Sequence, residues 1–169
     1  LKTSLLGKII RIMDDGSVPL DNPFVAGDEV LTSAASLDDN QSVSQYIYSY
    51  GHRNHQAILY DPVRQQIFAN EHGPAGGDEV NIIQAGYNYG WPVITQGLDY
   101  SGARISPFTR YPGMQQPWLD WTPSIAPSGM VMYRGEMFTN IQGDLLATSL
   151  KFKQVYWLQI KADKVVNQT

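Results

Sequence analysis

Residues Gly51–Pro92 read GHRNHQAILYDPVRQQIFANEHGPAGGDEVNIIQAGYNYGWP, and this stretch carries the clearest fold signals in the chain. It contains two runs rich in β-forming residues, 56–60 and 65–70, separated by Asp61-Pro62-Val63-Arg64. Proline is favoured at the second position of a tight turn, so the pattern predicts a β-hairpin. A further short strand is predicted over Asp78–Gln84, after a glycine-rich connection.

More strands are predicted on both sides of this hairpin. They are apolar or alternating runs that end at turn residues such as Asp14-Asp15-Gly16. No segment of a dozen residues keeps an apolar period of 3.6, so we expect little or no helix. A polar stretch, Ala26–Gln45, is expected to be a surface excursion. The additional strands are predicted over Gly7–Ile12, Tyr46–Tyr50, Ser128–Tyr133, Asp144–Ser149 and Gln154–Ile160.

The spacing of these strands is typical of an all-β protein built from repeated blades. Apolar strands that end at Tyr60 and Tyr133 are each followed by a turn and a second strand. Repeats of roughly 40 to 50 residues are typical of β-propellers, so 169 residues would supply about three to four blades. A propeller has to close its ring to avoid raw sheet edges. We therefore expect the chain to be a piece of a longer propeller.

Composition excludes several classes of function. A formal net charge of -4 argues against a nucleic-acid partner or an acidic membrane surface, either of which would need a basic face. No apolar run approaches the length of a membrane span. The chain has no cysteine, which excludes disulfides and thiolate metal sites but leaves the compartment open. The first twelve residues lack the layout of a signal peptide, so we expect that none was present or that it has been removed.

The glycine-rich connection suits a hard cation. Gly73 and Pro74 can offer carbonyl oxygens from a tight loop, and Asp78 and Glu79 are nearby carboxylates, an oxygen-only set of the kind that calcium prefers. The spacing is not that of an EF-hand. On local sequence alone, the favoured interpretation is that the two carboxylates cap a turn or are solvated.

A transition-metal site built from His52, His55 and His72 is a second interpretation of the segment. Imidazoles suit zinc, but residues i and i+3 of a strand face opposite ways, and no HExxH helix is present. We expect His52 and His72 to be hydrogen-bonded turn residues.

A third interpretation is a site for an anion or a quinone oxygen at Arg53 and Asn54, with Lys151 arriving from a later strand end. A guanidinium and an amide side by side can stabilise a carbonyl oxygen that gains charge during reduction. A surface salt bridge and a turn asparagine would explain the same pair. The aromatic cluster 118–121 can equally wall a flat cofactor or a sugar, or pack between blades.

Several motifs in the same order resemble one family. They are GKIIRI-MDDGSVPLDNPF, GHRNHQ, EHGPAGGDEVNII, YNYGWP, the tryptophan before IAPSG, and LLATSLK, which together run from about Gly7 to Ile160. The sequence resembles the soluble pyrroloquinoline-quinone (PQQ)-dependent aldose sugar dehydrogenases, or glucose/sorbosone dehydrogenases. The resemblance implies a six-bladed β-propeller, with 1–169 a partial propeller that lacks the N-terminal blades and the final segment.

The resemblance also implies cofactor contacts. Arg53 and Asn54 match the pair beside the reactive quinone carbonyl, and Lys151 matches a lysine at the charged edge of PQQ. Trp121 matches an aromatic at the rim of the cleft, and Ser124 matches a hydroxyl that contacts the cofactor.

Two calcium sites are implied in the same way. Gly73 and Pro74 match backbone carbonyls that hold the active-site Ca2+ beside the cofactor. Glu79 and the carbonyl of Tyr89 look like a second, structural Ca2+ site.

Some positions depart from the family pattern. His55 stands where the family usually has proline, and Ala57 where it has glycine. The family's general-base histidine would lie on an earlier blade and two cofactor-binding arginines after the last residue. We therefore expect no catalytic base in this chain and no activity from this part alone.

The implied activity is oxidation of an aldose sugar at C1 to a lactone, with hydride transfer to PQQ and onward transfer to an external electron acceptor. Family members are typically exported, which implies a periplasmic or secreted protein. The alternative is a non-enzymatic, calcium-stabilised β-propeller that binds carbohydrate or a protein partner.

Overall fold

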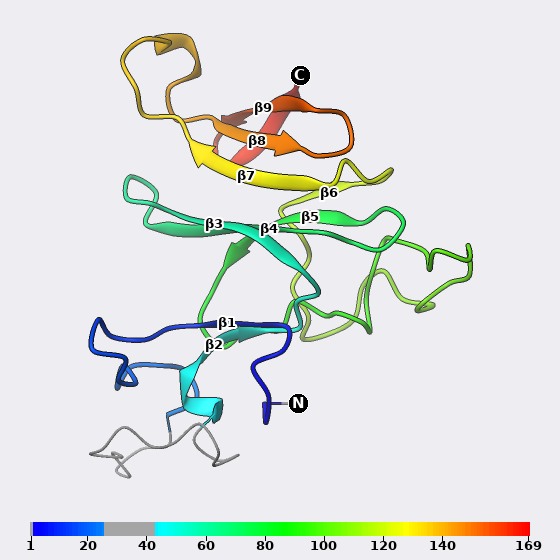
Figure 1. Ribbon diagram of the computed structural model, residues 1–169. Coiled ribbons are helices and arrows are strands. Elements are labelled where there is room, and N and C mark those ends of the chain that lie inside the picture. Colours follow the sequence, from blue (N-terminus) through cyan, green and yellow to red (C-terminus); the bar gives the residue numbers. More distant parts are fainter. Residues whose placement is uncertain (1, 26–42) are drawn as a thin grey trace.

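The computed structural model describes residues 2–25 and 43–169, and most of the predicted surface excursion lies outside these residues. Three antiparallel sheets are stacked one above another (Figure 1). The first pairs β1 (Lys8–Ile10) with β2 (Ile47–Tyr50). The second has the order β3-β4-β5-β6. Its strands are β3 (His55–Asp61), β4 (Gln66–Glu71), β5 (Asp78–Ile83) and β6 (Leu119–Trp121). The third has the order β10-β9-β8-β7. Its strands are β10 (Lys164–Gln168), β9 (Gln154–Lys161), β8 (Leu145–Ser149) and β7 (Pro127–Met132).

The all-β prediction is confirmed. The described residues contain only two short helical turns, the 3-10 helices η1 (Ser44–Tyr46) and η2 (Thr139–Ile141). Two sheets are complete four-stranded blades, and the β1–β2 pair is a smaller third sheet. Among the described residues, no helix is long and apolar enough to cross a membrane.

The hairpin at 55–71 follows the predicted turn. The Asp61 side chain accepts a hydrogen bond from the Val63 amide at 3.1 Å, which closes the turn between β3 and β4. The register pairs Leu59 with Phe68, so that both lie on the same face of the sheet. Residues of β3 alternate between partly buried and exposed, as a strand with one covered face should.

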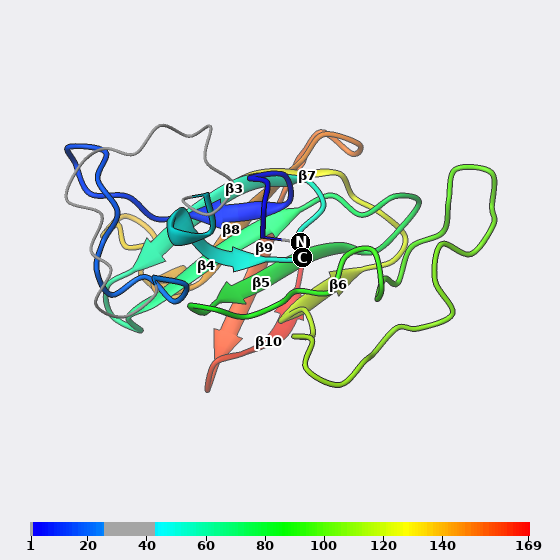
Figure 2. The same ribbon diagram turned by 90° about the horizontal axis from the view of Figure 1, so that it is seen from below.

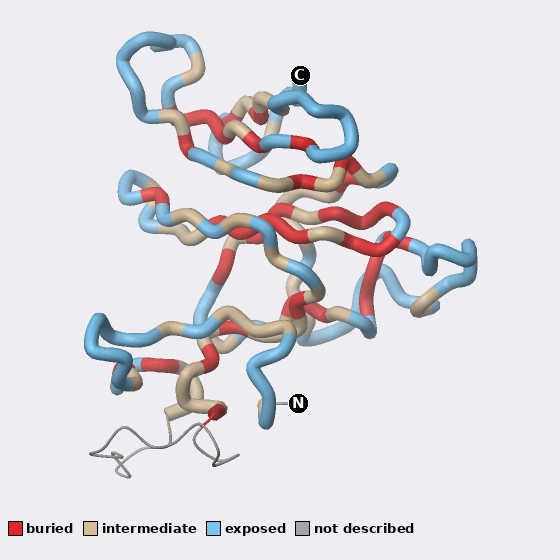
Figure 3. Tube along the Cα trace, viewed as in Figure 1, coloured by how far each residue is buried: buried red, intermediate tan, exposed pale blue. Residues whose placement is uncertain are grey.

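The main core lies between the two four-stranded sheets. It contains Phe68, Val80 and Trp121 from one sheet and Leu145 and Leu158 from the other. Figure 3 shows buried residues concentrated in the strands of these sheets. A second, smaller cluster joins the β1–β2 sheet to the middle blade, through Ala69, Ile83 and Tyr89 with Ile9, Tyr48 and Ile67.

A buried ion network also links the two blades. The Asp61 carboxylate is fully buried and receives hydrogen bonds from Arg64 at 2.8 Å and from Arg134 at 2.5 Å. Burial alone would raise the pKa of Asp61, but the two guanidinium groups hold it below its usual value. Arg134 follows β7, so this one carboxylate ties the β3–β4 hairpin to the neighbouring sheet.

Two strands were not predicted. β6 has only three residues between prolines, and β10 reads KVVNQ, with mostly polar side chains. The long connection 84–118 runs from β5 to β6 and extends beyond the sheets (Figure 2).

Candidate functional site

Three connections meet at one end of the blades. They are the turn 51–54 between β2 and β3, the loop 72–77 between β4 and β5, and the loop 122–126 between β6 and β7. The His72 amide donates to the Asn54 carbonyl at 2.9 Å, which joins the first connection to the second. The Gly77 amide donates to the Thr122 hydroxyl at 3.0 Å, which joins the second to the third. Residues far apart in the sequence are thereby fixed within one site.

Glu71 holds the turn that carries Arg53 and Asn54. One oxygen of its carboxylate accepts the backbone amides of Arg53 at 2.6 Å and Asn54 at 3.3 Å. The other accepts the Asn81 amide at 3.1 Å and lies 3.1 Å from His52 Nδ1. Burial alone would raise the pKa of Glu71, but these bonds and the nearby histidines lower it, so the residue is a carboxylate.

The two members of the predicted Arg53–Asn54 pair are held differently. Arg53 donates from Nη1 to the His72 carbonyl at 3.1 Å, and its guanidinium carbon lies 5.3 Å from the centre of the Trp91 ring. These contacts fix the guanidinium above the loop. The Asn54 side chain is exposed, and its oxygen accepts a hydrogen bond from Gln56 at 3.2 Å.

Asp78 joins the other two loops. It is fully buried; one oxygen accepts the Gly73 amide at 2.9 Å. The other accepts the amides of Ile125 at 2.9 Å and Ala126 at 2.8 Å and the Ser124 hydroxyl at 2.5 Å. Asp78 therefore caps loops, which was the favoured interpretation of its sequence context.

Lys151 reaches the same loop from the turn after β8. Its Nζ donates to the Ser124 carbonyl at 3.0 Å, and the side chain is otherwise exposed. A chain of contacts thus runs from Arg53 through the His72 carbonyl, Gly73 and Asp78 to Ser124 and Lys151. The two predicted cations, Arg53 and Lys151, lie at opposite ends of this chain of contacts.

Gly73 and Pro74 form a buried, tightly folded loop. A Cβ on Gly73 would overlap the carbonyl oxygens of Gly76 and Gly77, so only glycine fits there. The carbonyl oxygens of Gly76 and Gly77 therefore pack directly against Gly73.

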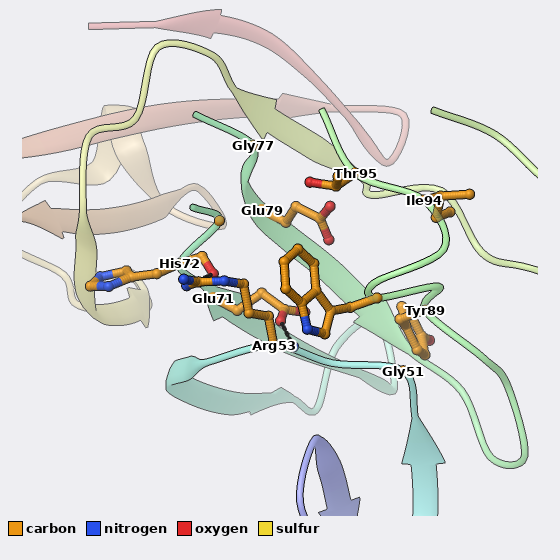
Figure 4. Close-up of a pocket in the computed structure, with 11 residues that line it drawn as sticks. Gly51, Arg53, Glu71, His72, Gly77, Glu79, Tyr89, Ile94 and Thr95 are labelled. Carbon is orange, nitrogen blue, oxygen red and sulfur yellow. Dashed lines mark hydrogen bonds between the residues drawn. The ribbon is translucent and has the colours of Figure 1, made fainter. Parts of the chain in front are cut away.

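A small, partly open cavity lies beside that loop. Its volume is about 10 Å³, close to the minimum for one water molecule or ion. Gly73, Glu79 and Tyr89 line it with Glu71 and Thr95, so the structure brings the predicted second metal pair to one cavity. Figure 4 shows Glu79 and Thr95 above Arg53 in this view.

Glu79 is electrostatically unusual. Burial, followed by the charges of Glu71, Asp120 and Asp78, raises its pKa to about 8. Within 2–25 and 43–169, the contact that opposes this shift is the hydrogen bond from Asn81 Nδ2 at 3.0 Å. A cation in the cavity would stabilise the ionised form of this carboxyl.

Trp121 does not line the site. Its side chain is 4% exposed, packs in the core between the two blades and donates from Nε1 to the Gln168 side chain at 2.7 Å. The predicted role at the cleft rim is therefore corrected to the packing role, because its pairing with Asp78 on β5 turns the indole inward. The aromatic ring beside Arg53 is that of Trp91.

The histidines are arranged differently from the expectation of opposed side chains. His52 lies in the turn before β3 and not on the strand, so the alternation rule does not separate it from His55, and the two ring centres are 4.2 Å apart. His52 and His72 are hydrogen-bonded turn residues, as expected, through Ser49 Oγ at 2.8 Å and the Pro127 carbonyl at 2.6 Å.

Three contributors were missed from the sequence. Glu71 ends a strand directly before the His-Gly-Pro loop, and a charge at the end of an apolar run was the available signal. Trp91 is part of the YNYGWP motif but gave no signal of its contact with Arg53. Thr95 lies in the long connection, where no sequence pattern pointed to the cavity.

Known proteins share this arrangement of sequence and fold. Residues 2–169 match the family described as Glucose / Sorbosone dehydrogenase. Aldose sugar dehydrogenase YliI of Escherichia coli (strain K12) is 40% identical over 163 residues, which are 95% of this chain and 40% of that protein.

Two solved structures are also similar. The soluble aldose sugar dehydrogenase from Escherichia coli in the apo-form has a TM-score of 0.83 and 37% identity, over 99% of this chain and 44% of that one. The PQQ-bound form of aldose sugar dehydrogenase from Streptomyces coelicolor has a TM-score of 0.66 and 27% identity, over 99% of this chain and 40% of that one. The chain spans 38% and 40% of two curated relatives that it matches.

Proposed function

The chain belongs to the glucose/sorbosone dehydrogenase family, and we propose that the protein containing it is a PQQ-dependent aldose dehydrogenase. Its reaction would be oxidation of a sugar at C1 to the lactone. Because the chain spans about two fifths of its curated relatives, the activity is proposed for the whole protein, with this chain supplying part of the site.

The observation that carries this proposal is a pair of uncompensated cations at the two ends of one contact network. Among residues 2–25 and 43–169, neither Arg53 nor Lys151 forms an ion pair with a carboxylate. Both are instead held by backbone carbonyls, of His72 and Ser124. This donor set suits an anionic quinone that presents carbonyl and carboxylate oxygens.

The residues would divide the work as follows. Arg53 and Asn54 would donate to the quinone oxygen on which negative charge develops, and Glu71 fixes their backbone. Ser124 and Lys151 would bind the charged edge of the cofactor. When bound, PQQ supplies the two-electron acceptor that sugar oxidation requires.

Calcium is proposed at two positions. The carbonyls of Gly73 and Pro74 would hold one ion beside the cofactor. Glu79 and the Tyr89 carbonyl would hold a second in the small cavity, where the raised pKa of Glu79 and the nearby Glu71 carboxylate support a hard cation in a lining that also includes Arg53 and Trp91. The general-base histidine, the external electron acceptor and export to the periplasm or beyond stay predictions about the whole protein.

The direct test is reduction of an artificial dye by the full-length protein supplied with PQQ, Ca2+ and a panel of aldoses. We expect sugar-dependent reduction that is lost when either PQQ or Ca2+ is withheld. A folded protein that reduces no dye with any aldose, yet is stabilised by Ca2+, would favour the alternative of a non-enzymatic propeller that binds carbohydrate or a protein.

A matched pair of lysines tests the cofactor assignment. Lys151→Met should weaken the apparent affinity for PQQ about tenfold, because the loss of one partly exposed charge contact is worth roughly 1.4 kcal/mol. Lys153→Met, two residues away and exposed, is the control. Equal PQQ titrations of the two variants would remove Lys151 from the cofactor site.

A further inference from the structure

Three side chains that can ligate a metal converge behind the turn 51–54. They are His52 before β3, His55 at the start of β3 and Glu71 at the end of β4. Each offers one ligand atom, and these atoms all lie within 4.8 Å of one another. Glu71 also lines the small cavity with Gly73, Glu79 and Tyr89, whereas His52 and His55 lie outside that lining.

The fold explains why the three meet. His55 and Glu71 are direct register partners on the antiparallel strands β3 and β4. Gly51 has a φ of +78°, which turns the chain so that the His52 ring stacks on Tyr89 at 4.6 Å and lies 4.2 Å from the His55 ring. His52 and His55 are three residues apart, and their rings meet because the chain turns at Gly51, not because they share a face of a strand.

Two of the three groups are already oriented for binding. His52 Nε2 lies 2.8 Å from Ser49 Oγ, a contact that can fix the ring as an outer-sphere hydrogen bond does in metal sites. His52 Nδ1 then faces the Glu71 carboxylate oxygen at 3.1 Å. Four-coordinate zinc with bonds of about 2.1 Å separates its ligand atoms by roughly 3.4 Å, so this pair is close to a chelating distance.

His55 supplies the unexplained observation. Both of its ring nitrogens are shielded from solvent and form no well-formed hydrogen bond among the described residues, the Asn70 backbone being only a weak partner. A shielded polar group without a partner costs about 1 to 3 kcal/mol. Burial lowers the pKa of His55, so the ring is kept in the neutral form that binds metals.

We propose that His52, His55 and Glu71 bind one divalent transition-metal ion, with Zn2+ as the first candidate. Two imidazoles and one carboxylate favour zinc and its neighbours over calcium. The three ligand atoms spread over up to 4.8 Å, wider than the roughly 3.4 Å between the ligands of tetrahedral zinc, so the side chains would draw together on binding, and water can fill a fourth position. The ion would clamp the turn 51–54 onto β4 while the second Glu71 oxygen keeps the Arg53 amide.

The test is metal counting on the full-length protein, which does not depend on its activity. After treatment with a chelator and return of excess Ca2+ to fill oxygen sites, the protein is titrated with Co2+ and then with Zn2+ against a competing dye. We expect a visible band of tetrahedral Co2+ that Zn2+ displaces. Its absence, together with no retained Zn2+, overturns the proposal.

Variants locate the ion. His55→Ala, and His55→Gln, which retains much of the side-chain volume, should each lose one equivalent of Zn2+ or bind it at least tenfold more weakly. His72→Ala is the control, because that ring is bound to the Pro127 carbonyl outside the cluster. If the wild type and both His55 variants retain the same number of Zn2+ ions with equal affinity, the cluster is not a metal site.

Discussion

Glu71 is a buried carboxylate with four polar neighbours, of which His52, Arg53 and Asn54 belong to the turn 51–54 and Asn81 belongs to β5. Glu71→Gln would replace a carboxylate that accepts hydrogen bonds from the Arg53 and Asn54 amides with a side chain whose NH2 group can only donate. We expect the free energy of unfolding in urea to fall by about 1 to 3 kcal/mol, because buried donors lose their acceptor. Glu136→Gln, at an exposed position, should change it by less than about 0.5 kcal/mol. Equal effects would show that Glu71 has no special role in the turn.

Glu79 leads to a pH prediction. Its pKa is raised to about 8 in the folded state, so between the unfolded value of 4.5 and that value the folded protein holds a proton that the unfolded chain releases. Without a cation, stability should therefore fall as pH rises from 5 to 8, by up to about 1.4 kcal/mol per pH unit.

Urea unfolding at pH 5, 6, 7 and 8 in a chelator measures this slope. Added Ca2+ should reduce it, because a bound cation favours the ionised carboxylate, and Glu79→Gln should remove it. A slope that is the same in the wild type and the variant would show that Glu79 does not control the pH dependence.

At the scale of elements, Asp61 couples a hairpin to the neighbouring blade. Asp61→Ala would leave Arg64 and Arg134 without their shared partner, and we expect a loss of about 3 kcal/mol in unfolding free energy. Asp163→Ala is the control, because Asp163 is 67% exposed and its 3.3 Å contact with Arg64 is worth less than about 1 kcal/mol. A small effect at Asp61 would mean that apolar packing alone holds the blades together.

The strands that the sequence predicted are bordered by turns that contain characteristic residues such as proline, aspartate and glycine. The β3–β4 hairpin was predicted because proline and aspartate define its turn, and the structure confirms both strands. β6 was missed because three residues are too few to show a period. β10 was missed because its side chains are mostly exposed, so that no apolar alternation marks it.

The site was less predictable than the fold. The family motifs pointed to Arg53, Gly73 and Lys151, and local sequence pointed to Asp78, but not to Glu71, the carboxylate that positions Arg53. The proximity of His52 and His55 depends on a glycine in the left-handed region, a backbone property that a strand-based rule does not consider. Trp121 was ambiguous because an aromatic residue serves equally well in a core and in a cleft.

At the scale of the whole molecule, the chain is part of a β-propeller, and two of its sheets are complete blades. Because it spans 38% and 40% of two curated relatives, we expect the natural protein to be more than twice as heavy as 18.9 kDa. Intact mass spectrometry of the protein from its source measures this directly. A mass of 18.9 kDa would contradict the prediction and leave the ring to be closed by association of separate chains.

Asp78 has a consequence for protein engineering. Its side chain accepts hydrogen bonds from two loops, 72–77 within the middle blade and 122–126 between that blade and the next, so reshaping one loop would disturb the other. Attempts to alter substrate preference by grafting one loop at a time should therefore fail more often than exchanges that replace both loops and their shared acid together.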